Sequence, residues 1–157
     1  MKFAEFICFE ATLPELEASD RDGAIDALVS ALHRAGKLKR GIYKEITKAV
    51  IDREREASTG IGKGVAVPHI KHPLAKDAIA VIGQSSAGID FCSLDKQPVF
   101  SIILLVSPVD NPDLHLQAME TIFRHLQQEK FRRFLRQCRT AESIEDLFRE
   151  ADTRPTW

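Results

Sequence analysis

The stretch S-T-G-I-G-K-G-V-A-V-P-H, residues 58–69, decides the fold of this chain. Three alternating glycines lead into a short apolar run, Val65 to Val67, which is followed by Pro68 and His69. Proline has no backbone N–H and restricts the residue before it to extended backbone. We therefore expect a short strand that stops at Pro68 and presents His69 at its carboxyl end, where sites in open α/β sheets lie.

Outward from this stretch, helical and strand patterns are interleaved. Apolar residues at helical spacing predict helices over 19–36, 42–56, 112–128, 131–138 and 141–151. Branched and aromatic runs predict strands over 3–9, 65–67, 78–83 and 99–106, the last buried on both faces. Ser19 is expected to cap the first helix, and Asn111 with Pro112 to begin the third. The pattern predicts one α/β domain over residues 1–157 with helices on both faces of a sheet.

Composition excludes several classes of function. Apolar residues make up 44% and charged residues 29% of 157 residues, and the net charge is -1, with no basic field for nucleic acid or membrane. Cys8, Cys92 and Cys138 form no paired motif, so we expect buried, reduced cysteines. No signal peptide and no apolar run of membrane-spanning length is found, which predicts a cytoplasmic protein whose partners are proteins or small molecules.

Known catalytic and binding motifs fail at specific positions. A phosphate-binding P-loop would need a glycine at Ala57 and a hydroxyl at Gly64, and a dinucleotide fingerprint would need a glycine at Val65. A serine nucleophile elbow would need a glycine at Ala87. His72 follows His69 closely, but no cysteine pair, H-E-x-x-H or carboxylate stands at ligand spacing. We expect no metal and no cofactor.

His69 is the candidate nucleophile. A neutral imidazole, with an ordinary pKa of about 6.5, attacks phosphorus at cytoplasmic pH, and the nearby glycines let backbone amides approach a phosphoryl group. A single histidine after a strand is more often structural than catalytic, so the surrounding residues decide the interpretation. Here they favour a phosphohistidine site.

Those residues resemble a known family. The run R-E-R-E-A-S-T-G-I-G-K-G-V-A-V-P-H, residues 53–69, resembles the signature of mannitol/fructose-type (type 2) enzyme IIA domains of the bacterial phosphotransferase system, and most of all the nitrogen-regulatory branch. The resemblance extends to F-C-S-L-D-K-Q-P-V at 91–99, S-P-V-D-N-P-D-L-H-L at 107–116 and A-E-S-I-E-D-L-F at 141–148. Ile70 departs from the family, which usually has a small residue there.

The resemblance implies a mixed sheet flanked by helices and a phosphoryl group accepted on His69 from the histidine-containing phosphocarrier protein. It also implies supporting roles for Arg53 and His115. A guanidinium and a second imidazole both suit the oxygens of a phosphoryl group. Ser58 and Thr59 are further candidate phosphate contacts. From the residues alone, Arg53 can equally be a charged surface residue with no role in the site. It belongs to the charged end of the helix predicted over 42–56, and we expect that end to be solvated on most faces.

Three functions stay open. The chain is either a nitrogen-type regulator that binds partners according to its phosphorylation, or a sugar-specific enzyme IIA that passes the phosphoryl group to a permease enzyme IIB. A binding module with a disabled site is the third reading, against which intact His69, Arg53 and His115 argue.

Overall fold

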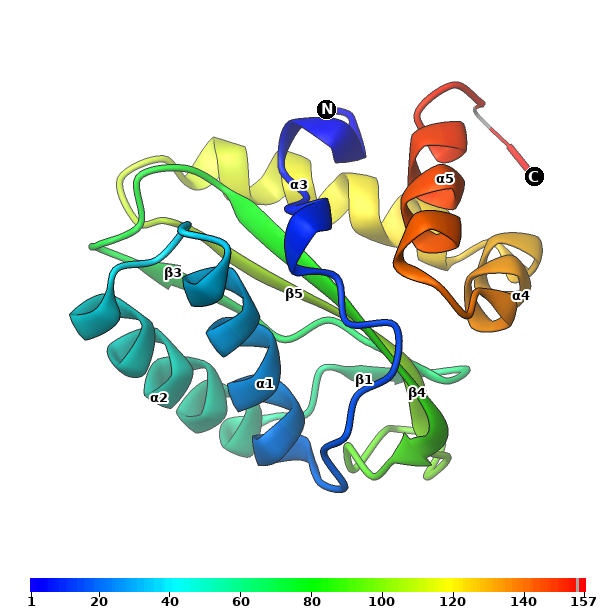
Figure 1. Ribbon diagram of the computed structural model, residues 1–157, viewed down its shortest axis with the longest axis horizontal. Helices are drawn as coiled ribbons and strands as arrows, with labels where there is room; N and C mark the ends of the chain where they lie inside the picture. Colours follow the sequence, from blue (N-terminus) through cyan, green and yellow to red (C-terminus); the bar gives the residue numbers. More distant parts are fainter. Residues whose placement is uncertain (155) are drawn as a thin grey trace.

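The computed structural model describes residues 1–154 and 156–157, and its centre is one mixed sheet (Figure 1). The strands are β1 (Gly60–Gly62), β2 (Val65–Ala66), β3 (His69–His72), β4 (Ile79–Ile89) and β5 (Val99–Pro108). β5 is central: it pairs antiparallel with β4 on one side and parallel with β2 and β3 on the other. β1 pairs antiparallel with β2.

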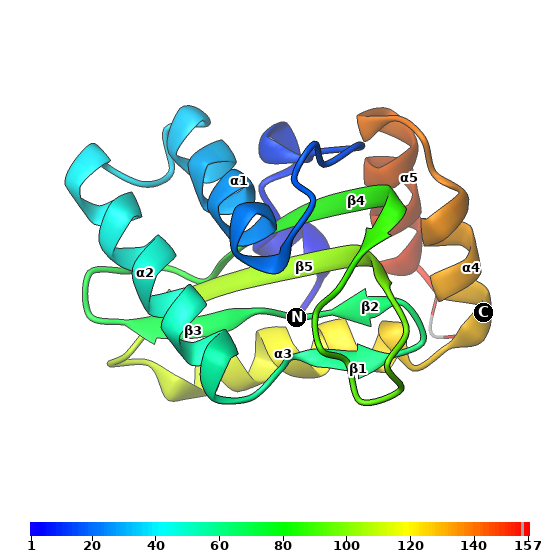
Figure 2. The same ribbon diagram turned by 90° about the horizontal axis from the view of Figure 1, so that it is seen from below.

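Helices cover both faces of this sheet, as predicted (Figure 2). They are α1 (Arg21–Arg34), α2 (Arg40–Glu56), α3 (Pro112–Leu126), α4 (Glu129–Gln137) and α5 (Ala141–Ala151). Successive side chains of a strand point to opposite faces. Ile102 and Leu104 of β5 accordingly pack with α1 and α2, whereas Ile103 and Leu105 pack with α3, α4 and α5. The expected burial of this strand on both faces is confirmed.

The proline before the candidate histidine interrupts the sheet without ending it. Val65 pairs with Ser101 and His69 pairs with Leu105, so β2 and β3 keep one register along β5. Pro68 removes one donor, but its carbonyl still accepts a hydrogen bond from the Leu105 N–H at 2.9 Å. The expected stop of the strand before Pro68 is confirmed, because β2 ends at Ala66, but the expectation that His69 lies at a carboxyl end of the extended run is wrong. His69 begins β3, halfway along an extended run.

The N-terminal segment is not the strand predicted over residues 3–9. It forms two short 3-10 helices, η1 (Phe3–Glu5) and η2 (Phe9–Ala11), and between them Ile7 makes an isolated parallel bridge to Ala80 of β4. Phe3 and Phe6 are both buried, and their separation by three residues is the spacing of a helical turn. Phe3 packs edge-on against Phe148, with the ring centroids 4.8 Å apart.

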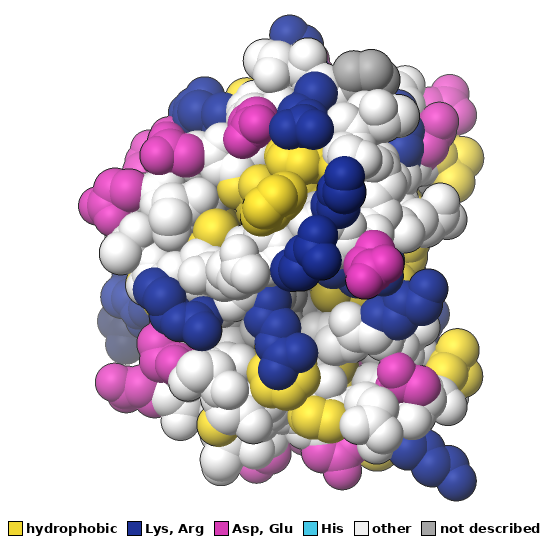
Figure 3. All heavy atoms as spheres, turned by 90° about the vertical axis from the view of Figure 1, so that its right-hand side faces the viewer, with side chains coloured by type: hydrophobic (Ala, Val, Ile, Leu, Met, Phe, Trp, Pro, Cys, Tyr) yellow, Lys and Arg dark blue, Asp and Glu magenta, His cyan; other side chains and the backbone are white. Residues whose placement is uncertain are grey.

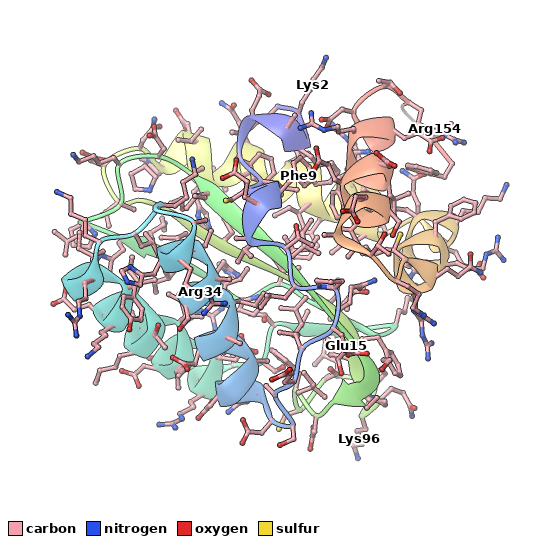
Figure 4. The ribbon with its side chains drawn as sticks, viewed as in Figure 1. Lys2, Phe9, Glu15, Arg34, Lys96 and Arg154 are labelled. Carbon is pink, nitrogen blue, oxygen red and sulfur yellow. The ribbon has the colours of Figure 1, made fainter. Side chains whose placement is uncertain are left out.

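The chain then continues alongside β4 (Figure 4). Glu15 accepts a hydrogen bond from the Ser86 N–H at 3.0 Å, and the Leu16 N–H donates to the Gln84 carbonyl at 2.7 Å. This segment therefore covers the edge of the sheet opposite β3 without forming a regular strand.

Two expectations about single residues are also wrong. The cap of α1 is Asp20 and not Ser19, because the Asp20 carboxylate accepts from the Gly23 N–H at 2.7 Å while its own backbone is extended. Cys92 is exposed, with a positive φ of 53° in the loop before β5, whereas Cys8 is buried as expected. No helix in the described part of the chain is long and apolar enough to cross a membrane.

Candidate functional site

The ring of His69 is oriented by its own strand. His69 is half-buried at the start of β3, and its Nδ1 lies 2.7 Å from the carbonyl oxygen of Val67. A carbonyl oxygen only accepts hydrogen bonds, so Nδ1 carries the proton in this contact. In the neutral ring, Nε2 therefore keeps its lone pair, which is the form of imidazole that attacks phosphorus.

His115 lies beside this ring although it is far away in sequence. Asn111 caps α3 by accepting from the Leu114 N–H at 3.3 Å, so the first turn of the helix follows directly after the end of β5. Because β5 pairs with β3, this turn brings the His115 ring to a centroid separation of 5.6 Å from that of His69. His115 is 8% exposed, and its Nδ1 is hydrogen-bonded to the hydroxyl of Ser107, the buried residue next to the end of β5.

The surroundings of His115 favour its neutral form. Burial lowers the pKa of His115 below its ordinary value, and positive charge on His69 and on Lys71 lowers it further. Lys71 is exposed, pairs with Ser107 across the sheet, and shares the face of β3 that carries His69. Sequence reasoning missed Lys71 and Ser107. Because residues i and i+2 of a strand share a face, the sequence could have indicated that Lys71 lies on the same face as His69. Nothing in the sequence indicates that Ser107 contacts His115.

Arg53 is less directly connected to the site. It lies half-buried in the last turn of α2, a helix that packs against β3, and its Nη1 donates to the Ala57 carbonyl at 2.9 Å. Within the described residues, no hydrogen bond joins Arg53 to His69. The structure thus brings His115 to His69, and it places Arg53 on the neighbouring helix.

The hydroxyls of Ser58 and Thr59 are used inside the protein. Ser58 donates to the Phe91 carbonyl at 2.5 Å, and Thr59 donates from its hydroxyl to Glu54 Oε1 at 2.7 Å. The Thr59 N–H also donates to Glu54 Oε2, at 2.5 Å. Glu54 is only 1% exposed, so the expectation of a charged helix end solvated on most faces is wrong at this residue. Its side chain is turned into the loop because that loop supplies two donors.

The unusual residue after the histidine faces away from the site. Ile70 packs against the core formed with α1 and α2, whereas His69 faces α3. The larger side chain therefore fills the opposite side of the sheet.

The other histidines have different roles. His72 accepts from the Leu74 N–H at 3.1 Å, and His33 stacks on Tyr43. His125 is buried, with its ring nitrogens 3.0 Å from the Thr121 carbonyl and 3.3 Å from the Ala151 carbonyl. Across residues 1–154 and 156–157, no group of three or more His, Cys, Asp or Glu side chains is placed to hold a metal ion.

Comparison with known proteins identifies the family. Residues 6–151 match the family described as "Phosphoenolpyruvate-dependent sugar phosphotransferase system, EIIA 2", and the chain belongs to it. The chain is 30% identical to a nitrogen regulatory protein of Bradyrhizobium diazoefficiens over 92% of each chain. It is 31% identical to the fructose-specific EIIABC component of Bacillus subtilis over 97% of this chain, which spans about a quarter (24%) of that longer protein.

Solved structures show the same fold. The nitrogen regulatory protein IIA-Ntr of Neisseria meningitidis superimposes with a TM-score of 0.82 at 23% identity, covering 92% of this chain and 97% of that one. The mannitol IIA of Escherichia coli superimposes with a TM-score of 0.73 at 20% identity, covering 88% and 96%. The predicted mixed sheet flanked by helices, and the resemblance to the enzyme IIA family, are confirmed.

Proposed function

We propose that His69 accepts a phosphoryl group from the phosphorylated histidine-containing carrier protein of the phosphotransferase system. The observation that carries this proposal is the Nδ1 contact with the Val67 carbonyl, which leaves Nε2 as the nucleophile. The Nε2 lone pair forms the new bond to phosphorus while the bond between phosphorus and the donor imidazole breaks, and its electron pair returns to the donor ring. No proton has to move to or from His69.

His115 and Lys71 supply the electrostatic support for this step. If the Ser107 hydroxyl donates to Nδ1 of neutral His115, the remaining proton of that ring is on Nε2 and can be donated to a phosphoryl oxygen. The positive charge of Lys71 lies on the same face of β3. Arg53 completes the set if its side chain leaves Ala57 when a phosphoryl group arrives. Preorganised donors of this kind are what phosphoryl transfer requires.

We expect the donor to be a protein because His69 is half-buried at the surface and lines neither of the two hollows described on this molecule. These two hollows are lined by other residues. One is lined by residues that include Asp26 and Tyr43, and the other by residues that include Phe6 and Lys76. A phosphohistidine presented by another protein reaches such a surface, whereas a small phosphate donor would be held in an enclosed site.

The test is labelling with the general enzyme of the system, the carrier protein and phosphoenolpyruvate. Wild-type protein should take up one acid-labile phosphoryl group, and His69→Gln should take up none while keeping its circular dichroism spectrum. His72→Gln, in the same strand, is the matched control and should label normally. Undiminished labelling of the His69→Gln variant would overturn the proposal.

We further propose a regulatory role, in which the phosphoryl group on His69 changes the partner that this surface binds. The support is the similarity to the Bradyrhizobium nitrogen regulatory protein over nearly the full length of both chains. The alternative is a sugar-specific enzyme IIA, supported by the fructose-specific relative from Bacillus subtilis. Transfer from the phosphorylated protein to a purified fructose or mannitol IIB domain at a rate comparable to carrier-dependent labelling would favour the alternative.

A further inference from the structure

A hydroxyl is buried at the end of β5, where the strand meets the site. Ser107 is 0% exposed, and the residues that precede it on the same face of β5, Ile103 and Leu105, are apolar. Leu105 pairs with His69, so this face of β5 lies beside His69. Burying a hydroxyl costs free energy unless it forms a hydrogen bond. The partner of Ser107 is Nδ1 of His115, and this contact explains a polar side chain in an apolar surrounding.

The direction of this hydrogen bond determines which nitrogen of His115 carries the proton. A hydroxyl donates one proton or accepts, whereas a neutral imidazole has one N–H and one lone pair. Within the described part of the chain, the Ser107 hydroxyl has no second partner. If it accepted from His115, its own buried proton would have no acceptor, and buried donors are left unsatisfied more rarely than buried acceptors. The balance therefore favours donation from Ser107 to Nδ1.

Donation by Ser107 makes the other ring nitrogen a donor. When Nδ1 accepts, the single proton of neutral His115 is on Nε2. Burial lowers the pKa of His115, which favours this neutral ring. Across residues 1–154 and 156–157, His115 Nε2 has no hydrogen-bond partner, and it is not one of the buried side-chain atoms left unpaired. Its N–H is therefore available to a phosphoryl oxygen beside the His69 ring, whose centroid is 5.6 Å from that of His115.

We propose that Ser107 is a positioning residue whose hydroxyl donates to Nδ1 of His115 and so keeps an Nε2–H for the phosphoryl group, an inference that rests on the proposed function of His69. The bond from His69 Nε2 to phosphorus forms while the bond from phosphorus to the donor imidazole breaks, and that electron pair returns to the donor ring. The protons of Ser107 and His115 stay on their own atoms. His115 stabilises the charge on a phosphoryl oxygen, and Ser107 holds its ring in place.

The first measurement is the tautomer of the two histidines in the unphosphorylated wild-type protein. Nitrogen NMR at a pH where both rings are neutral should show the proton of His115 on Nε2 and the proton of His69 on Nδ1. An Nδ1–H tautomer of His115 would overturn the proposal, because the Ser107 hydroxyl would then be the acceptor. This measurement needs no variant of Ser107 and no phosphoryl transfer, so its outcome is independent of the His69→Gln labelling test.

The second measurement uses Ser107→Ala, which removes the hydroxyl from the buried strand. An Nδ1–H population of His115 should become detectable, and phosphoryl transfer from the carrier protein should slow by about tenfold, as it does when a supporting group is misplaced. Ser101→Ala is the matched control. Ser101 is also buried in β5, and its hydroxyl donates to Gln84 Oε1 at 2.5 Å. The Ser101 variant should match the wild type in the His115 tautomer and in the transfer rate.

A double variant separates positioning of His115 from a general structural role. Because Ser107 acts through His115, Ser107→Ala should slow transfer when His115 is present and should have no further effect on a His115→Ala variant. A folded Ser107→Ala variant that transfers at the wild-type rate would overturn the proposal. So would an equal loss of rate in both backgrounds. If Ser107→Ala does not fold, the wild-type tautomer of His115 remains the deciding measurement.

Discussion

The two imidazoles of the site are held by different kinds of contact. The ring of His69 is held by the carbonyl of Val67, two residues earlier in the chain. The ring of His115, in the first turn of α3, is held by the hydroxyl of Ser107 at the end of β5. The first contact leaves a lone pair on Nε2, and the second is compatible with an N–H on Nε2. In the proposed transfer, this pair would combine a nucleophile with a hydrogen-bond donor.

Replacing Arg53 or His115 by alanine should slow phosphoryl transfer at least about tenfold, because losing one preorganised donor typically costs on the order of 10² to 10³ in rate. The measurement is single-turnover transfer from the phosphorylated carrier protein. The matched controls are Arg55→Ala, an exposed residue paired with Asp22, and His72→Ala. Variants at Arg53 and His115 that transfer as fast as these controls would remove both residues from the site.

The lowered pKa of His115 predicts a pH dependence of stability. The unfolded state, with an ordinary histidine pKa of about 6.5, binds a proton more readily than the folded state does. The free energy of unfolding should therefore fall as the pH drops below about 6.5, with no contribution from His115 above that value. Urea unfolding at pH 7.5 and pH 5.0 should show a larger loss for the wild type than for His115→Gln. Equal losses in the two proteins would contradict this account.

Among the elements, the loop before β1 and the loop before β5 approach each other closely. Ser58 donates to the Phe91 carbonyl, and the Leu94 N–H donates to the Gly60 carbonyl at 3.3 Å. A Cβ atom on Gly60 would lie 2.2 Å from the Ser93 hydroxyl and 3.1 Å from the Ser93 Cα. This contact helps to hold Thr59, and with it the backbone that leads to His69.

Gly60→Ala should therefore destabilise the protein by about 1 to 3 kcal/mol, the usual cost of overpacking a buried site. The measurement is the midpoint of urea unfolding. Gly41→Ala is the matched control, because nothing lies within 4 Å of its added Cβ and the residue is in α2. That change should stabilise by roughly 0.5 to 1 kcal/mol through helix propensity. Equal effects of the two substitutions would show that the loops do not restrict Gly60.

At the scale of the whole molecule, the site lies at the edge of the sheet between its two helical layers. β3 carries His69, α2 packs on one side of it, and α3 brings His115 to the other. The opposite end of the molecule is different (Figure 3). Basic side chains gather on that face, and no histidine is visible among the described residues there. The helix α4 at this end of the molecule carries the exposed residues Lys130, Arg133 and Arg136.

The two ends of the chain stabilise each other at the α3 to α5 layer. The Asp152 carboxylate accepts from the Phe3 N–H at 2.6 Å and from the Ala4 N–H at 3.0 Å. Asp152→Ala should lower stability by about 1.5 to 3 kcal/mol, because it removes a charged acceptor for two amides. Hydrogen exchange should show faster exchange at residues 3 and 4. Asp146→Ala, exposed on α5, is the control, and equal stability of the two variants would contradict the expected role of Asp152.

Sequence alone determined what depends on short-range pattern. Helical periodicity predicted α1 to α5 closely, because the spacing of buried residues is fixed by the helix itself. The apolar run of β5 predicted its central place, and the signature that ends at His69 indicated the family. The prediction of a strand over residues 3–9 was wrong. The conformation of so short a segment depends on the core against which it packs, here the core around Phe148.

Tertiary structure alone decided what depends on residues far apart in the chain. Only the parallel pairing of β3 with β5 brings His115 to His69, and only the close approach of Gly60 to Ser93 shows why that glycine has no side chain. The charged stretch at the end of α2 reads as solvated, yet Glu54 is buried because the folded loop gives it two hydrogen-bond donors. A periodic pattern records which face of an element is apolar, but a buried charge is explained only by the partners that the fold supplies.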